Sequence, residues 1–126
     1  MRVYARVLFS VAAVANLLVG LSILAIWNTV APLLLQLDPV HGANLWLVYF
    51  SGSMIGLFGV AYLLIARDPH TYRPCIAMFA TAKTVAFACA LAVWLAGASS
   101  VRLSLVLSAD LVFALLFIDY LRRTAR

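Results

Sequence analysis

The chain has 126 residues, of which 67% are hydrophobic and 10% are charged, and its formal net charge is +5. A water-soluble domain is about half apolar and a quarter charged, so this composition excludes a soluble globular domain and a disordered chain. We therefore expect a single integral membrane domain over residues 1–126, long enough for at most four crossings and too short for a separate catalytic domain.

Four long apolar stretches predict the membrane-spanning segments. Each has about 19 to 22 residues, enough to cross a hydrocarbon core of about 30 Å. Backbone polar groups in lipid must be hydrogen-bonded within the chain, and helices satisfy that requirement at this repeat length. The expected fold is an all-α, antiparallel bundle of four transmembrane helices, because short connections place successive helices side by side. The approximate helix boundaries are 7–27, 45–66, 75–96 and 103–121.

The three connections differ in length and character. The first, residues 28–44, contains an apolar run at 32–37 that is too short to span a membrane. It is expected either to pack in the outer interface or to fold as a lid over a cavity. In the second connection, Arg67-Asp68-Pro69 ends one helix and Arg73-Pro74 opens the next. The third connection is a tight turn at residues 97–100.

The arginines predict the direction of insertion. They lie at the ends of the apolar runs rather than on one polar face, so we expect lipid headgroups as their partners and no nucleic acid. Seven lie on the side of the two termini and the second connection, whereas Arg102 lies on the other side. Because cytoplasmic loops carry an excess of Lys and Arg, both termini are expected in the cytoplasm.

A polar layer is predicted inside the membrane, and its strongest members are Lys83 and Asp110. Counted from the inner ends of their helices at 1.5 Å per residue, Lys83 lies about 12 Å deep and Asp110 about 16 Å deep. Asn16 falls at about 14 Å, and Ser53 falls near the same level. A charge at mid-bilayer costs at least about 2.5–3.5 kcal/mol, so Lys83 and Asp110 should face the interior and offset each other. These four residues are candidates for binding a proton, an ion or a polar headgroup; the alternative is a structural pair that fixes helix register.

Neither a catalytic group nor a metal site is predicted. Cys75 and Cys89 lie about 21 Å apart along one helix, too far for an intramolecular disulfide. His41 and His70 lie in connections on opposite sides of the membrane, so they are not expected to share a metal ion.

Glycines mark one face of the second predicted helix. Gly52 and Gly56 are four residues apart and Gly59 follows, so the three define a stripe of small residues. Small residues let helix backbones approach closely in membranes. We expect the stripe to pack against the first or third helix; contact with a second copy of the chain or with a larger complex is the alternative.

Several short motifs give the chain a family resemblance. They are Gly56-x-x-Gly59 with Tyr62, Ala66-Arg67-Asp68-Pro69, Tyr72-Arg73-Pro74, Lys83, and Asp110-Leu111-Val112-Phe113. With these motifs and its topology, the chain resembles the DoxX-like group of small four-helix bacterial membrane proteins. The resemblance implies a four-helix architecture in the bacterial cytoplasmic (inner) membrane. Some members of that group are linked to quinone-dependent redox reactions or to the maturation of periplasmic enzymes.

Three functions are compatible with these features. A non-enzymatic subunit or assembly factor of a larger membrane complex is favoured, because the chain is almost loop-free and has no catalytic group outside the bilayer. A proton-coupled transporter would use Lys83 and Asp110. A quinone- or lipid-binding protein would need a cavity that reaches the same two residues, and no other cofactor is expected.

Overall fold

The structure is a computed structural model that describes residues 2–35 and 42–125. All regular elements in this described part are helices, which confirms the predicted all-α class. Four of them are long and apolar enough to cross a membrane, and they overlap the four predicted segments. The elements in chain order are α1 (Arg2–Ala25), α2 (Trp27–Val30), the π-helical turn η1 (Ala31–Leu35), α3 (Ala43–Arg67), α4 (Arg73–Leu95) and α5 (Val101–Arg123).

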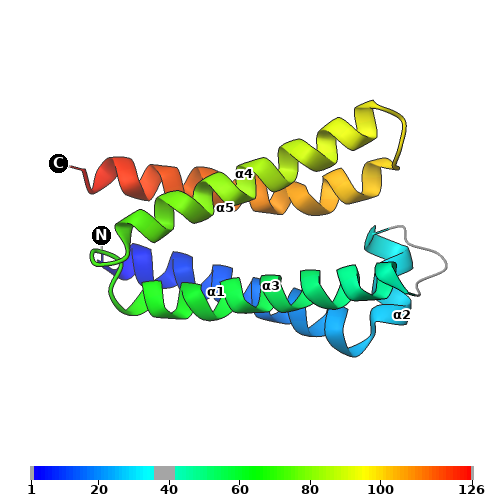
Figure 1. Cartoon of the computed structure of the whole chain (residues 1–126). Coiled ribbons are helices and arrows are strands. Elements are labelled where there is room, and N and C mark those ends of the chain that lie inside the picture. Colours follow the sequence, from blue (N-terminus) through cyan, green and yellow to red (C-terminus); the bar gives the residue numbers. More distant parts are fainter. Residues whose placement is uncertain (1, 36–41, 126) are drawn as a thin grey trace. The chain divides into compact units, whose positions relative to one another are not determined.

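The chain divides into two compact units, Met1–Arg67 and Asp68–Arg126. In the first unit α1 packs along α3, and in the second unit α4 packs along α5 (Figure 1). Each unit is therefore a helical hairpin with its own contacts. The association of the hairpins into a four-helix bundle, and the side of the membrane on which the termini lie, stay predictions.

The first hairpin is held by a close approach of two backbones at Gly20. A Cβ atom on Gly20 would lie 2.6 Å from the Gly56 nitrogen and 2.8 Å from the Gly52 carbonyl oxygen. Earlier in α1, Leu17 reaches Gly59, where an added Cβ would lie 2.7 Å from the Leu17 Cγ atom. Because later residues of α1 meet earlier residues of α3, these two helices run in opposite directions. Glycine is needed at this crossing since any side chain would push the backbones apart.

The predicted glycine stripe on α3 thus faces α1, but its members contribute differently. A Cβ on Gly52 would lie 2.9 Å from the Ile23 Cγ2 atom. A Cβ on Gly56, in contrast, would meet no atom of the described structure within 4 Å. Gly56 therefore contributes backbone atoms to the contact with Gly20, whereas a side chain added at Gly56 would point into open space.

Part of the first connection packs back onto this hairpin. Ala31 in η1 is fully buried in a cluster with Ile23 of α1 and Val48 of α3. Trp27 of α2 lies partly buried against the same cluster. The described part of the connection is thus a packing segment. Residues 36–41, on which the prediction of a lid also rests, lie outside the described residues.

The sequence signals at the ends of α4 and α5 act as predicted. α4 begins at Arg73 with Pro74 in its first turn, where proline leaves no helical hydrogen bond unmade. Gly97 adopts a φ of +71°, a left-handed conformation that the tight turn needs and that glycine adopts without a steric penalty. The Ser100 hydroxyl oxygen then caps α5 by accepting the backbone N–H of Arg102 at 3.3 Å. The chain can therefore reverse within five residues and return along α4.

The turn before α4 is closed by Asp68. One carboxylate oxygen accepts the hydroxyl of Thr71 at 2.6 Å, and the other accepts the Thr71 backbone N–H at 3.3 Å. These hydrogen bonds, the one from the hydroxyl first among them, lower the pKa of Asp68 below its ordinary value. The charged form of Asp68 is therefore the one that holds the turn.

Both hairpins expose large apolar side chains along much of their length. Val7, Leu18, Leu105 and Leu115 keep between 58% and 63% of their surface exposed. Exposed apolar surface on this scale is disfavoured in water, whereas lipid tails solvate it. The surface thus agrees with the length and composition of the four long helices.

Replacing Gly20 with alanine is expected to destabilise the first hairpin by about 1–3 kcal/mol, because the added methyl group would overlap the α3 backbone. Gly56→Ala is the matched control. It adds the same methyl group in open space and gains helix propensity, so stability should be unchanged or slightly higher. Thermal unfolding of both variants in detergent measures the difference, and an equal loss for both would contradict this packing.

Thr71→Ala is expected to raise the pKa of Asp68 toward its ordinary value, because the hydroxyl hydrogen bond is lost. Since this pKa is lowered in the folded chain, the contribution of the carboxylate to stability is complete above its unfolded-state pKa. That contribution is lost as the pH falls through the lowered folded-state pKa. An NMR titration of the aspartate side-chain carbons in micelles should show wild-type Asp68 titrating at lower pH than in the variant. Superimposable curves would show that Thr71 does not hold the carboxylate.

Candidate functional site

The second hairpin brings Lys83 of α4 and Asp110 of α5 together in an ion pair. Lys83 lies ten residues after Arg73, the first residue of α4, which places it about 15 Å along that helix. Asp110 lies thirteen residues before Arg123, the last residue of α5, or about 20 Å from that end. Both side chains therefore lie near the middle of their helices. The prediction that they meet at a shared level is confirmed within this hairpin.

The two partners differ in exposure. The Lys83 side chain keeps 5% of its surface exposed and the Asp110 side chain 28%. The Lys83 ammonium nitrogen also lies 5.6 Å from the centre of the Phe113 ring, which follows Asp110 by one helical turn. A cation over a ring face gains about 0.5–2 kcal/mol, the larger values applying where water is excluded. Asp110 and Phe113 thus contact the same ammonium group from a single face of α5.

Neighbouring hydroxyl groups are engaged within their own helices. Thr84, next to Lys83, donates to the Ala80 carbonyl oxygen at 2.8 Å. Ser108, two residues before Asp110, donates to the Leu105 carbonyl oxygen at 2.5 Å. Such back-bonding is common for Ser and Thr in apolar helices, where the hydroxyl has no water to bind. These two hydroxyls therefore donate to backbone groups rather than to the ion pair.

The ion pair lies between two other polar links that the structure describes between α4 and the last helical segment of the chain. Toward the open end of the hairpin, Arg73 donates to the Leu121 carbonyl oxygen at 3.1 Å and also to the Thr124 hydroxyl. Toward the turn, the Ser104 hydroxyl donates to the Ala90 carbonyl oxygen at 3.2 Å. Partners later in α4 are earlier in α5, so the two helices run in opposite directions and share one register.

The outer two links were not predicted from the sequence. Arg73 stood out as a helix-opening residue, but its reach across to the last turn of α5 depends on the register of the hairpin. Ser104 has no local feature that separates it from the other serines of the chain. A weak signal did exist for Arg73, since a cation favours the free carbonyl groups at a helix C-terminus.

The other two predicted members of the polar layer lie in the first hairpin. Asn16 is 8% exposed, and its side-chain amide points to the Ile55 carbonyl oxygen at 3.5 Å, at the long limit for a hydrogen bond. This contact links α1 to α3 beside the glycine crossing. Ser53 is exposed on α3. The association of Asn16 and Ser53 with the ion pair stays a prediction.

Outside the site, the structure describes one further ion pair, between Asp119 and Arg123 of α5. Asp119 accepts the Arg123 Nε–H with both carboxylate oxygens, at 2.8 and 2.9 Å, as expected for residues one helical turn apart. Both side chains are exposed to a substantial degree, so this pair contributes little to stability.

Within residues 2–35 and 42–125, no three His, Cys, Asp or Glu side chains gather in a way that could hold a metal ion.

Two grooves among the described residues are lined by residues other than the ion pair. One, of about 390 Å³, lies between α1 and α3 and is lined by Arg6, Ser10, Leu63, Ala66 and Arg67. The other, of about 330 Å³, lies along α4 and α5 beside Thr81 and Ile118. Neither has Lys83 or Asp110 in its lining. These grooves therefore do not supply the cavity that a quinone or lipid bound at the ion pair would require.

Comparison of the chain with protein-family models, curated proteins and solved structures gives no match. The resemblance to DoxX-like proteins accordingly stays a prediction. The four long apolar helices indicate the class of the molecule, a multi-pass membrane protein. Its activity has to be argued from the chemistry of the ion pair and of the surfaces around it.

Lys83→Met removes the ammonium group but keeps most of the side-chain volume, so the Asp110 carboxylate loses its counter-charge. We expect a loss of about 3 kcal/mol, at the low end for a broken buried pair because Asp110 keeps some exposure. The double variant Lys83→Met/Asp110→Leu has no charge left in the middle of the hairpin and should recover most of that loss. Unfolding free energies of the wild type, both single variants and the double variant give the coupling energy. A double variant as unstable as the two single variants would show that the Lys83–Asp110 pairing does not stabilise the second hairpin.

Proposed function

We propose that the protein is a non-enzymatic subunit or assembly factor of a larger membrane complex. The proposed form is an antiparallel bundle of four helices with both termini in the cytoplasm. The observation that carries the proposal is that Lys83 and Asp110 engage each other within one hairpin. A pair of this kind fixes the register of two helices, and no ligand is needed to neutralise either charge.

Two further observations support a role in assembly. The connections at residues 68–72 and 96–100 are too short to build a site outside the membrane. Apolar side chains such as Leu105 and Leu115 are exposed on α5, and they can pack against lipid or against helices of another protein. The bacterial cytoplasmic membrane is the proposed location, based on the distribution of arginines and on the resemblance to DoxX-like proteins.

Proton-coupled transport is the second candidate, and the exposure of Asp110 favours it. With 28% of its side chain exposed, Asp110 offers a proton or a cation an approach that the lysine does not offer. Ionisable residues inside membranes commonly mark such pathways. Quinone or lipid binding at the same residues is a weaker alternative, because the two grooves described above are lined by other residues.

A native pull-down of the full chain in mild detergent, analysed by mass spectrometry, tests the assembly role. Wild type and Lys83→Met/Asp110→Leu should recover the same membrane proteins in fixed proportion, because neither has an uncompensated charge in the second hairpin, whereas Lys83→Met should recover less. Isolation of the wild type solely as a free monomer from its native membrane would contradict the proposal.

The transport candidate is decided by a separate measurement. In liposomes, a transporter that uses Asp110 should lose proton-coupled flux on Asp110→Asn, because the amide cannot carry the proton. Unchanged flux would exclude transport through this residue, and it would leave the assembly role standing.

A further inference from the structure

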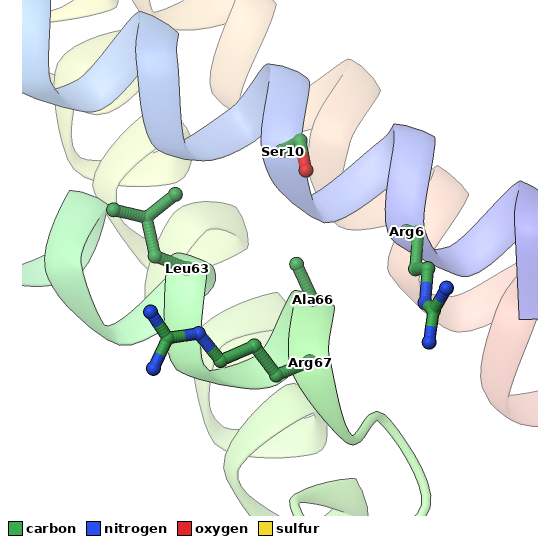
Figure 2. A pocket seen from close by; sticks show the side chains of 5 residues that line it. All are labelled: Arg6, Ser10, Leu63, Ala66 and Arg67. Atoms are coloured by element: carbon green, nitrogen blue, oxygen red, sulfur yellow. The ribbon is translucent and has the colours of Figure 1, made fainter.

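The groove between α1 and α3 combines two cations with an apolar wall. Arg6 and Ser10 are four residues apart on α1, so they project from one face of that helix. Leu63, Ala66 and Arg67 line the groove from α3. Figure 2 shows Ala66 directed toward α1 and the Arg67 side chain extended along α3, away from Arg6. The groove has a volume of about 390 Å³ and is open to the surroundings.

Within the described residues of the first hairpin, the two arginines have no negative partner. The structure describes no ion pair for Arg6 or Arg67, although it describes such pairs elsewhere. Asp38 is the one acidic residue in the sequence of the first unit, and it lies outside the described residues. Asp68, the residue after Arg67, already accepts two hydrogen bonds from Thr71. A counter-charge for the groove must therefore come from outside the described part of this hairpin.

The position of the groove along the helices restricts the source of that charge. Arg67 is the last residue of α3, and Arg6 lies in the second turn of α1, so the cations are close to the helix ends. Ser10 and Leu63 lie one turn deeper, toward the apolar middle of the same helices. In a membrane-spanning hairpin this gradient puts the cations at headgroup level and the apolar wall at the start of the acyl chains.

We propose that this groove binds the phosphate of an anionic phospholipid, with the exposed Arg6 and Arg67 side chains turning toward the phosphate oxygens and the Ser10 hydroxyl donating a further hydrogen bond. Arginine is suited to this task because its planar guanidinium group offers paired N–H donors to phosphate. Leu63 and Ala66 give the first part of an acyl chain an apolar surface. The site is independent of the role proposed for the Lys83–Asp110 pair.

The test is a titration of the full-length protein in detergent with dioleoyl phosphatidylglycerol, followed by native mass spectrometry. Wild type should retain this lipid in preference to the zwitterionic dioleoyl phosphatidylcholine. Arg6→Gln/Arg67→Gln should weaken retention by roughly tenfold or more, because each arginine near a membrane surface contributes about 1 kcal/mol. Inorganic phosphate should fail to displace the lipid, since it cannot use the apolar wall.

The matched control is Arg2→Gln/Arg122→Gln. It removes two arginines that are exposed and that do not line the groove, so the net charge of the two double variants is equal. Retention of phosphatidylglycerol by this control should stay close to wild type. An equal loss in both double variants, no preference of the wild type for the anionic lipid, or full displacement by inorganic phosphate would each overturn the proposal.

Ser10→Asp keeps the test decisive if the double arginine variant fails to fold. Ser10 is exposed, so an aspartate can be accommodated there, and its carboxylate would neutralise the groove from within. This variant should retain its helical circular dichroism and lose the preference for phosphatidylglycerol. A folded Ser10→Asp protein that binds the lipid as well as wild type would also overturn the proposal.

Discussion

The second hairpin depends on one ion pair, between Lys83 and Asp110, in the middle of two long apolar helices. In a medium without water, neither an ammonium nor a carboxylate group is tolerated alone, so Lys83 and Asp110 constrain each other's helices to one register. The links at Arg73 and Ser104 follow from that register, since both require α4 and α5 to be aligned along their whole length. Polar groups thus determine a structure that is otherwise almost entirely apolar.

The two helices of the first hairpin are held together by close backbone contact rather than by an ion pair. These helices carry no charged pair in the middle, and they come together where Gly20 rests on the backbone of Gly52 and Gly56. Because lipid removes the hydrophobic drive for helix association, close backbone contact and dispersion have to provide the attraction. The two halves of the chain should therefore respond to different changes: the first to side-chain size at the crossing, and the second to charge.

The sequence predicted what depends on position along one helix and failed where two helices must be aligned. Lys83 and Asp110 could be found because an ionisable residue in a long apolar run is conspicuous and its depth follows from residue spacing. The role of Gly20 at the helix crossing could not be predicted, because it depends on which backbone atoms of α3 lie opposite this isolated glycine. Asn16 was predicted as a member of the polar layer from its position along the first helix, but its contact with Ile55 is a property of the pairing of α1 with α3. Ala31 of the π-helical turn η1 is buried against Ile23 and Val48, and no local sequence signal predicts that contact.

The arginines show why a charge count predicts orientation better than it predicts function. Arg73 and Arg123, both in the second hairpin, have partners within the protein, the first at the end of α5 and the second at Asp119. Arg6 and Arg67 have no carboxylate within the described part of the first hairpin, although they count equally in the positive-inside rule. The same residue type thus closes a hairpin in one half of the chain and leaves a positive groove in the other. Under the lipid site proposed above, an anion that also carries an acyl chain would neutralise these cations, cover the apolar wall and so complete the first hairpin.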